Sequence, residues 1–343
     1  MVPPIRAIRV VRGYNLLSVL SVAMRALLAN RAEGLRLRDV AAPDEERFCR
    51  IRVTMAGICG TDLQLLEGYA GFDGIPGHEF VGVVDRAPAE HKQWIGKRVV
   101  GEINIGCGHC GWCQHGVKEH CENRSVLGIR QHGGAFAEFT SLPAANLHEV
   151  PDSIDDETAV FVEPTAAACR ILEQMTIDAG ARVAVVGDGR MGLLTAQVLR
   201  TAAPDVTVFG RHATKLAIAR SLDLQTAESN TAVPPSSRFD VVVDVTGRPE
   251  GMRRAIAIVR PRGTVVMKST FHGEAPVESW PIVVDEVVLV GSRCGPFRPA
   301  MELLASGAVN VKPLISRIAA LDEFESAFAD ARRGVKVLFA MNR

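Results

Sequence analysis

Residues 182–202 read RVAVVGDGRMGLLTAQVLRTA: an apolar run, a glycine-rich turn and a helix-like segment. RVAVVG is typical of a buried strand, and MGLLTAQVLRTA has helical spacing. In this context the glycines permit a tight turn and let the backbone approach a pyrophosphate at the helix N-terminus. We predict that Gly187, Gly189 and Gly192 bind a dinucleotide; the alternative is a turn without a ligand.

The strand that follows ends in VFGRHATKL, residues 208–216. An acid about 20 residues after the glycines would normally bind the ribose 2'-hydroxyl, but Gly210 occupies its place. Arg211, His212 and Lys215 follow, and cations without a competing carboxylate suit a 2'-phosphate. The stretch favours NADP(H) over NAD(H), unless these are only solvated charges at a helix start.

Strand-like and helix-like segments alternate from residue 152 to residue 295. This alternation predicts an α/β fold, a doubly wound parallel sheet of about six strands. Residues 24–151 instead hold short β-like runs broken by glycines, which predicts a β-rich domain. The tail, 296–343, contains two amphipathic helices that we expect to return to that first domain.

The composition sets limits on partners and location. Lys+Arg and Asp+Glu are both 39, so no global field attracts nucleic acid or an anionic membrane, and no apolar run is long enough for a spanning helix. Residues 1–23 carry three arginines, no acid and a short apolar run. We interpret them as a disordered extension rather than a signal or transit peptide, and we expect a cytoplasmic protein.

Residues 107–121 read CGHCGWCQHGVKEHC. Four thiolates in one loop, Cys107, Cys110, Cys113 and Cys121, can reach a tetrahedral metal, and zinc fits best. An iron-sulfur cluster is the alternative; disulfides between cysteines this close would be strained. A closed four-cysteine site stabilises a loop and does no chemistry, and the nearby histidines are then exposed residues rather than ligands.

The catalytic candidates lie elsewhere, in AGICGTDLQLLEGY, GIPGHEFVGVV and FVEPTAAA. Cys59, His78 and a carboxylate, Glu79 or Glu163, would leave one coordination position open, as a catalytic zinc requires. Taken singly, each residue has an ordinary explanation: a buried cysteine, a hydrogen-bonded core histidine, and an acid at a helix N-terminus.

Together these motifs resemble the zinc-dependent medium-chain dehydrogenases/reductases, the superfamily of alcohol, sorbitol, threonine and glucose dehydrogenases. The resemblance runs from Met24 to the C-terminus and rests on CGTDL, GHEFVGVV, the four-cysteine stretch, GAFAEF, the pair Glu163 and Pro164, and GDGRMG, in family order. It implies a GroES-like catalytic domain, 24–151 with 296–343, around an inserted Rossmann domain, 152–295.

The resemblance also implies roles for single residues. Cys59 and His78 would bind catalytic zinc, Glu79 and Glu163 would alternate as ligand or hold a water, and Thr61 would bond the substrate oxygen and pass on its proton. Many relatives end this relay on a histidine three positions later, where this chain has Gln64. Glutamine cannot titrate, so the proton must leave by another route.

The expected activity is hydride transfer between an alcohol, polyol or sugar and NADP(H), with one catalytic and one structural Zn²⁺. We expect a homo-oligomer, a dimer or tetramer, acting on a small molecule without nucleic acid or membrane. Tyr69, Phe72 and Arg293 are candidate substrate-contacting residues. Two other hypotheses stay open: a zinc-independent reductase of activated alkenes, and a non-catalytic dinucleotide sensor.

Overall fold

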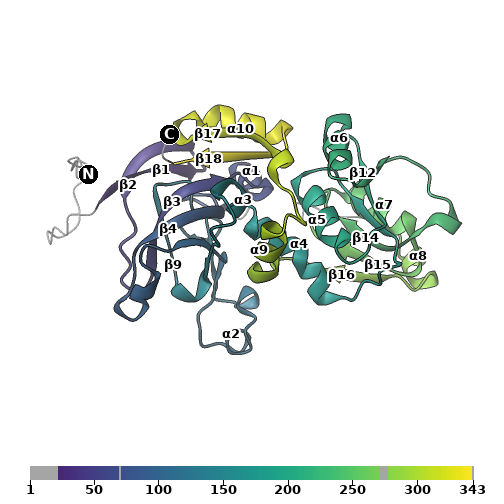
Figure 1. Cartoon of the computed structure of the whole chain (residues 1–343), viewed down its shortest axis with the longest axis horizontal. Helices are drawn as coiled ribbons and strands as arrows, with labels where there is room; N and C mark the ends of the chain where they lie inside the picture. The colour runs from purple at the N-terminus through teal and green to yellow at the C-terminus, as the bar shows by residue number, and fades with distance from the viewer. Residues whose placement is uncertain (1–21, 69–70, 270–276, 342–343) are drawn as a thin grey trace. The chain divides into compact units, whose positions relative to one another are not determined.

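The computed structural model describes residues 22–68, 71–269 and 277–341 and separates the chain into two compact units. The first unit runs to Val160 and resumes at Arg317, and the second covers Phe161–Ser316. Figure 1 shows a β-rich first unit and a second unit in which helices surround a sheet. The predicted extension, residues 1–23, falls almost wholly outside the described residues, and the first strand begins at Ala23.

The first unit is built mainly from antiparallel strands. A seven-stranded sheet has the order β10-β5-β4-β3-β18-β17, with β9 also paired to β3; β1 and β2 form a hairpin, and β6, β7 and β8 a small sheet. The strands are β1 (Ala23–Asn30), β2 (Gly34–Ala41), β3 (Cys49–Gly57), β4 (Glu79–Arg86), β5 (Arg98–Gly101), β6 (Asn104–Ile105), β7 (Ser125–Leu127), β8 (Gln131–His132), β9 (Phe139–Leu142), β10 (Leu147–Glu149), β17 (Ile315–Ala320) and β18 (Lys336–Ala340).

Short helices connect these strands. They are α1 (Gly60–Leu66), α2 (Gly111–Gln114), α3 (Asp156–Ala159) and α10 (Phe324–Arg333), with the 3-10 turns η2 (Ala89–Trp94), η3 (Lys118–His120), η4 (Ala144–Asn146) and η7 (Leu321–Glu323). Phe136 packs edge to face against Phe328 and Phe339 in the core, with the Phe136 and Phe339 ring centroids 5.3 Å apart. The residues from Arg317 onward therefore complete the first unit, and α10 belongs to it.

Strand register brings three chain segments together at one end of the strands in the large sheet. Gly57, the last residue of β3, pairs with Glu79, the first residue of β4. Gly57 also pairs with Leu338 in β18. The end of β3, the start of β4 and the start of β18 therefore meet, although they are far apart in sequence.

The second unit is a six-stranded parallel sheet of order β13-β12-β11-β14-β15-β16, the doubly wound order 3-2-1-4-5-6. All four residues of β11 are buried, as expected for a strand covered on both faces. The elements are β11 (Val183–Val186), β12 (Val206–Gly210), β13 (Gln225–Glu228), β14 (Phe239–Asp244), β15 (Val259–Met267), β16 (Val288–Gly291), α4 (Val162–Gln174), α5 (Arg190–Arg200), α6 (Ala213–Ser221), α7 (Pro249–Ile258), α8 (Ser279–Val284), α9 (Phe297–Ala305), η5 (Pro235–Ser237) and η6 (Lys312–Leu314).

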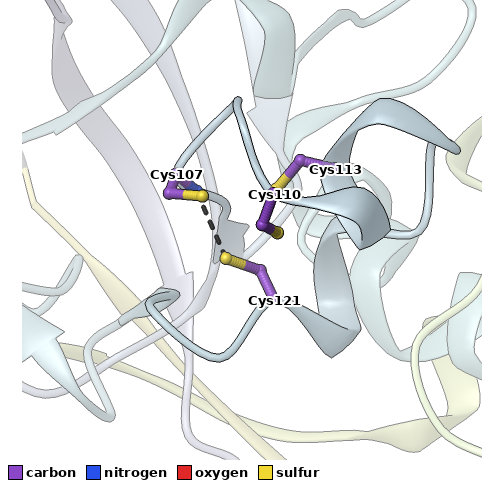
Figure 2. A group of neighbouring side chains, drawn as sticks. All are labelled: Cys107, Cys110, Cys113 and Cys121. Atoms are coloured by element: carbon purple, nitrogen blue, oxygen red, sulfur yellow. Dashed lines mark hydrogen bonds between the residues drawn. The ribbon is translucent and has the colours of Figure 1, made fainter.

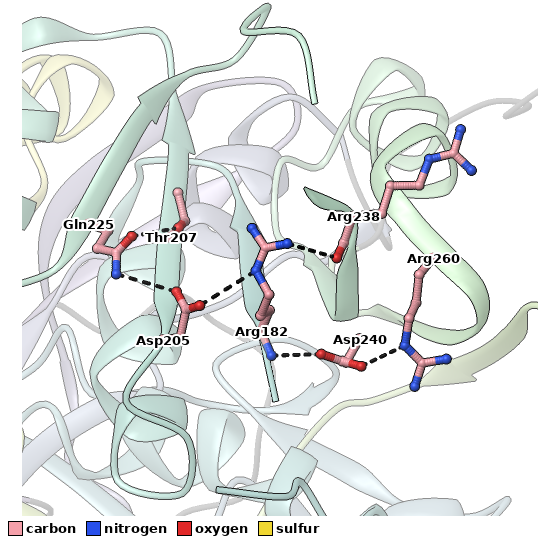
Figure 3. Close-up of polar contacts among 7 residues, drawn as sticks. All are labelled: Arg182, Asp205, Thr207, Gln225, Arg238, Asp240 and Arg260. Atoms are coloured by element: carbon pink, nitrogen blue, oxygen red, sulfur yellow. Dashed lines mark hydrogen bonds and ion pairs between the residues drawn. The ribbon is translucent and has the colours of Figure 1, made fainter. Parts of the chain in front are cut away.

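A polar network ties together the amino ends of these parallel strands (Figure 3). Arg182, just before β11, donates its backbone N–H to Asp240 Oδ2 at 2.7 Å, and its Nε lies 3.5 Å from Asp205 Oδ2. Asp240 also accepts from Arg260 Nε at 2.6 Å. These contacts link the amino ends of neighbouring strands, whereas ligands of doubly wound sheets bind at the carboxyl ends of the strands.

The unit boundaries differ from those predicted. We expected breaks at 151/152 and 295/296, whereas the two units divide at 160/161 and 316/317. The first tail helix, α9, stays with the second unit because it packs along α4. Amphipathic spacing alone could not show which of two domains its apolar face covers.

Candidate active site

Cys59 lies two residues after the end of β3 and is the N-cap residue of α1. Its backbone N–H donates to Asp62 Oδ2 at 2.7 Å, the acid-to-cap hydrogen bond of a capping box. The other oxygen of Asp62 accepts from the Gly77 N–H at 3.3 Å. Asp62 therefore fixes the start of α1 against the segment that carries His78.

His78 and Glu79 stand at the start of β4, and both are almost fully buried. Ligand atoms of Cys59, His78 and Glu79 all lie within 4.8 Å of one another. The structure thus groups three of the four residues predicted for a catalytic metal.

The charges around His78 favour a cation. Nδ1 of His78 lies 3.4 Å from Asp62 Oδ1 and, among the described residues, has no hydrogen bond of ordinary geometry. Burial acts to lower the pKa of His78, but the negative charges of Asp62 and Cys59 outweigh it and raise the pKa well above 6.5. A buried imidazole nitrogen without a hydrogen bond in the described chain, beside a thiol and carboxylates, is a donor set that fits Zn²⁺.

Lys336 is a site residue that the sequence analysis missed. Its side chain is fully buried, forms an ion pair with Glu79, and donates to the Ile58 carbonyl oxygen at 3.3 Å. A Cβ on Gly57 would lie 2.6 Å from Lys336 Cε, so the glycine leaves room for the lysine stem. Burial lowers the pKa of Lys336 to about 8, despite the opposing charges of Cys59 and Asp62. A lysine within the apolar run VKVLFA was the available signal.

The other predicted catalytic residues lie in different places. Thr61 is in α1, with its Oγ1 3.9 Å from Cys59 Sγ. Glu163 lies in the first turn of α4, in the second unit, where its negative charge acts to raise the pKa of the half-buried Lys268. Burial lowers the pKa of Lys268 to about 8, although Cys294 and Glu163 oppose that shift. Phe72 is 9% exposed, Arg293 is exposed, and Tyr69 lies outside the described residues.

The four-cysteine stretch forms a separate lobe, defined as residues 107–121. Figure 2 shows the four thiols converging, and the sulfur atoms lie within 4.8 Å of one another. The backbone of His109 lowers the pKa of Cys107 to about 6. The Cys113 backbone lowers that of Cys110, but burial and the neighbouring thiols raise it to about 11. The four sulfurs cannot all ionise without a cation, and Zn²⁺ fits this set.

The three histidines of the lobe are exposed, as predicted. His109 Nδ1 contacts the Cys107 carbonyl oxygen at 2.9 Å, and His115 Nδ1 contacts that of Gly111 at 2.7 Å. Lys118 anchors the lobe through Glu102, whose Oε2 lies 2.7 Å from Lys118 Nζ. Glu102 Oε1 lies 2.7 Å from His148 Nε2 on the neighbouring strand.

The glycine-rich turn lies at the carboxyl ends of the parallel strands in the second unit's sheet. Gly187 follows β11 with φ +127°, a conformation that favours glycine, and donates its N–H to the Phe209 carbonyl oxygen at 2.8 Å. A Cβ on Gly192 would lie 1.9 Å from the Gly187 carbonyl oxygen, and Gly189 is the N-cap of α5. Gly210 ends β12, with Arg211, His212 and Lys215 beside it at the start of α6.

Comparisons with known proteins agree with this arrangement. The family model "Alcohol dehydrogenase GroES-like domain" matches residues 45–152, and "Glucose dehydrogenase C-terminus" matches 156–341. The chain belongs to the zinc-type medium-chain dehydrogenase/reductase family. It is an alcohol-dehydrogenase-type oxidoreductase, which transfers a hydride between an alcohol and a carbonyl compound. Its two units are a GroES-like domain and a Rossmann-like domain.

Individual relatives match along most of their length. An L-threonine 3-dehydrogenase of Streptomyces avermitilis is 33% identical over 92% of this chain and 98% of its own, and D-arabinitol dehydrogenase 1 of Uromyces fabae is 31% identical over 84% and 88%. A solved structure, described as a zinc-binding dehydrogenase of Sinorhizobium meliloti 1021 bound to NADP, is 30% identical with a TM-score of 0.85, covering 93% of this chain and 99% of that one.

Proposed function

We propose that this dehydrogenase uses one catalytic and one structural Zn²⁺ and prefers NADP(H). The observation that carries the catalytic assignment is the buried convergence of Cys59, His78 and Glu79 within 4.8 Å. The lobe supports the structural assignment, because its four sulfurs would leave no open position on a tetrahedral metal.

Cys59 and His78 would hold the catalytic metal, with Asp62 orienting the imidazole. Bound there, Zn²⁺ would supply Lewis-acid chemistry toward the substrate oxygen. Lys336 holds Glu79 by an ion pair, so we assign Glu79 to balancing charge behind the site and propose Glu163 as the additional carboxylate. This assignment rests on the engagement of Glu79 with Lys336 and on the resemblance to zinc-dependent medium-chain dehydrogenases.

Oxidation of an alcohol removes one hydride and one proton. A bound nicotinamide cofactor would supply the hydride acceptor, and the chain must carry the proton away. We assign the Thr61 hydroxyl, 3.9 Å from Cys59 Sγ, to accept that proton and hand it on. Gln64 follows three residues later in α1 and cannot titrate, so onward transfer passes through water or cofactor hydroxyls.

The NADP(H) preference is supported by the residues at the end of β12. Gly210 supplies no carboxylate there, and Arg211 and His212 are exposed beside it. The Sinorhizobium meliloti relative bound to NADP supports the same choice. For the substrate we propose a small hydroxylated compound, because the relatives are named for threonine and arabinitol.

A homo-oligomer is supported by the edge of the Rossmann-like sheet. Edge strand β16 and helix α8 expose large apolar side chains in the described chain: Trp280 is 63% exposed, Val283 73%, Val284 68% and Val288 52%. An uncovered apolar edge strand invites pairing, and a second copy of the same edge is self-complementary about a two-fold axis. We therefore propose a dimer through this edge.

A cytoplasmic location is supported by the cysteines, since all eight lie in the described part of the chain and none forms a disulfide there. No helix of that part is long and apolar enough to cross a bilayer.

The proposal is tested by titrating the purified protein with NADPH and NADH separately, following nucleotide fluorescence, and then assaying polyols, sugars and amino alcohols with the tighter cofactor. We expect tighter NADPH binding and EDTA-sensitive turnover. Tighter NADH binding would contradict the proposal that the absence of a carboxylate at Gly210 favours NADP(H). Turnover unaffected by complete zinc removal would point to zinc-free reductase chemistry.

A further inference from the structure

Asp188, between the first two glycines of the turn, extends to the end of the neighbouring strand β12. Its Oδ2 accepts the backbone N–H of Arg211 at 2.8 Å and that of His212 at 2.7 Å. The His212 ring Nδ1 lies 3.0 Å from Oδ1. Asp188 is 6% exposed, so the carboxylate is enclosed by the segment that it binds.

The same carboxylate fills the space beside Gly210. A Cβ at position 210 would lie 2.5 Å from Asp188 Oδ2, 2.6 Å from Asp188 Cβ and 2.7 Å from Leu216 Cδ2, all closer than real Cβ contacts; the two nearest atoms belong to Asp188, and the third is the end of a flexible side chain. The side chain that ends this strand in many dinucleotide-binding domains is therefore incompatible with Asp188. An acid at 188 and an acid at 210 exclude each other by space as well as by charge.

Cations surround this buried acid. Burial is the largest cause of the lowered pKa of Lys215. The negative charge of Asp188 acts to raise that pKa, and the positive charge of Arg190 acts to lower it. Burial raises the pKa of Asp188, but hydrogen bonds from His212 and Arg211 lower it overall, so the carboxylate stays charged. Its oxygens face N–H groups of the protein, while Arg211 and His212 are exposed to solvent.

We infer that Asp188 is a positioning residue for cofactor choice: it excludes a ribose-binding acid from position 210 and holds the Arg211–His212 segment toward the ribose 2'-phosphate. This inference rests on the proposed function, because it requires a dinucleotide at the GDGRMG turn. The determinant of cofactor choice is then a pair of positions, 188 and 210, on two adjacent strand ends.

The test is a double-substitution cycle on the full-length, zinc-loaded protein, with Kd measured for NADPH and NADH. Asp188→Ala should weaken NADPH about tenfold and NADH less than about threefold. Gly210→Asp should weaken both cofactors by at least about tenfold. Combining the two should return NADH to within about threefold of wild type while NADPH stays weak.

A matched control is Asp205→Ala, which removes an acid at the amino end of β12, the strand that Gly210 ends (Figure 3). This substitution should leave the ratio of the Kd values for NADPH and NADH unchanged. If Gly210→Asp prevents folding, Gly210→Ala replaces it, and thermal melting should show it better tolerated together with Asp188→Ala.

The outcomes separate the inference from the proposed function. Tighter NADPH binding by Asp188→Ala would mean that the carboxylate only repels phosphate and would overturn the inference. Independent effects at 188 and 210 would overturn it as well. A wild type that prefers NADH would overturn the proposed NADP(H) preference, while coupling between the two positions would still support their mutual exclusion.

Discussion

The two groups of metal-ligating side chains in the first unit are built in opposite ways. The lobe draws its four sulfurs from fifteen consecutive residues and includes exposed side chains. The Cys59–His78–Glu79 group joins the end of β3, the start of β4 and, through Lys336, the start of β18. The lobe is a local device, whereas the second group depends on the register of the whole sheet and is surrounded by buried charges.

The difference teaches that two groups of metal-ligating side chains in one domain can have different roles. Four thiolates in a closed set hold a loop in place. One thiolate, one imidazole and buried acids leave room for substrate. We therefore expect damage to the Cys59–His78–Glu79 group to appear in turnover and damage to the lobe to appear in stability.

The largest effect should come from His78→Ala. Loss of the ligand should lower kcat by about a thousandfold or more, because Lewis-acid stabilisation contributes several kcal/mol to the barrier. Turnover and zinc per chain are measured together, and His109→Ala, which removes an exposed lobe histidine, serves as control. Wild-type turnover by a His78→Ala variant whose site is free of metal would contradict a catalytic role for a metal at the Cys59–His78–Glu79 group.

Lys336→Met should cost about 3 kcal/mol of unfolding free energy, because it leaves the buried Glu79 carboxylate without its cation. Adding Glu79→Gln should recover more than half of that loss. Chemical denaturation of the four proteins of this cycle measures the coupling. Equal losses with and without Glu79→Gln would show that the ion pair does not matter to the site.

Cys113→Ser should release the lobe zinc and lower the melting temperature by about 5–10 °C, since a loss of about 2–3 kcal/mol shifts a domain of this size by that amount. The remaining folded enzyme should keep kcat within about threefold. Calorimetry and zinc analysis check both statements. A kcat loss as large as that of His78→Ala would assign the lobe a catalytic role.

Glu102→Gln should have the smallest effect, about 1 kcal/mol, because it weakens the anchor of the lobe without touching a ligand. Burial raises the pKa of Glu102, but bonds from His148 and Lys118 lower it below 4.5. Its stabilisation is thus present above pH 4.5 and disappears as the pH falls through the lower folded pKa. The stability difference from wild type should vanish in acid; a difference independent of pH would exclude the ion pair as its cause.

Sequence patterns predict the features of this chain that depend on residues close together in sequence. The lobe could be predicted from spacing, and the doubly wound sheet from alternation, because both follow from neighbouring residues. The run VKVLFA carries a signal for a buried Lys336, but its contact with Ile58 could not be predicted, because it spans 278 positions. The role of Asp188 could not be predicted, because the glycine motif specifies no residue type at that position. The unit of α9 could not be predicted either, because helical spacing does not show which domain its apolar face contacts.

The measurement that tests the account most directly is anomalous diffraction at the zinc absorption edge from crystals of the enzyme. The account predicts one peak among the four lobe sulfurs and a second between Cys59 Sγ and His78, inside the buried group. A peak at the lobe alone, in crystals of active enzyme, would contradict the assignment of Cys59 and His78 as ligands of a catalytic metal.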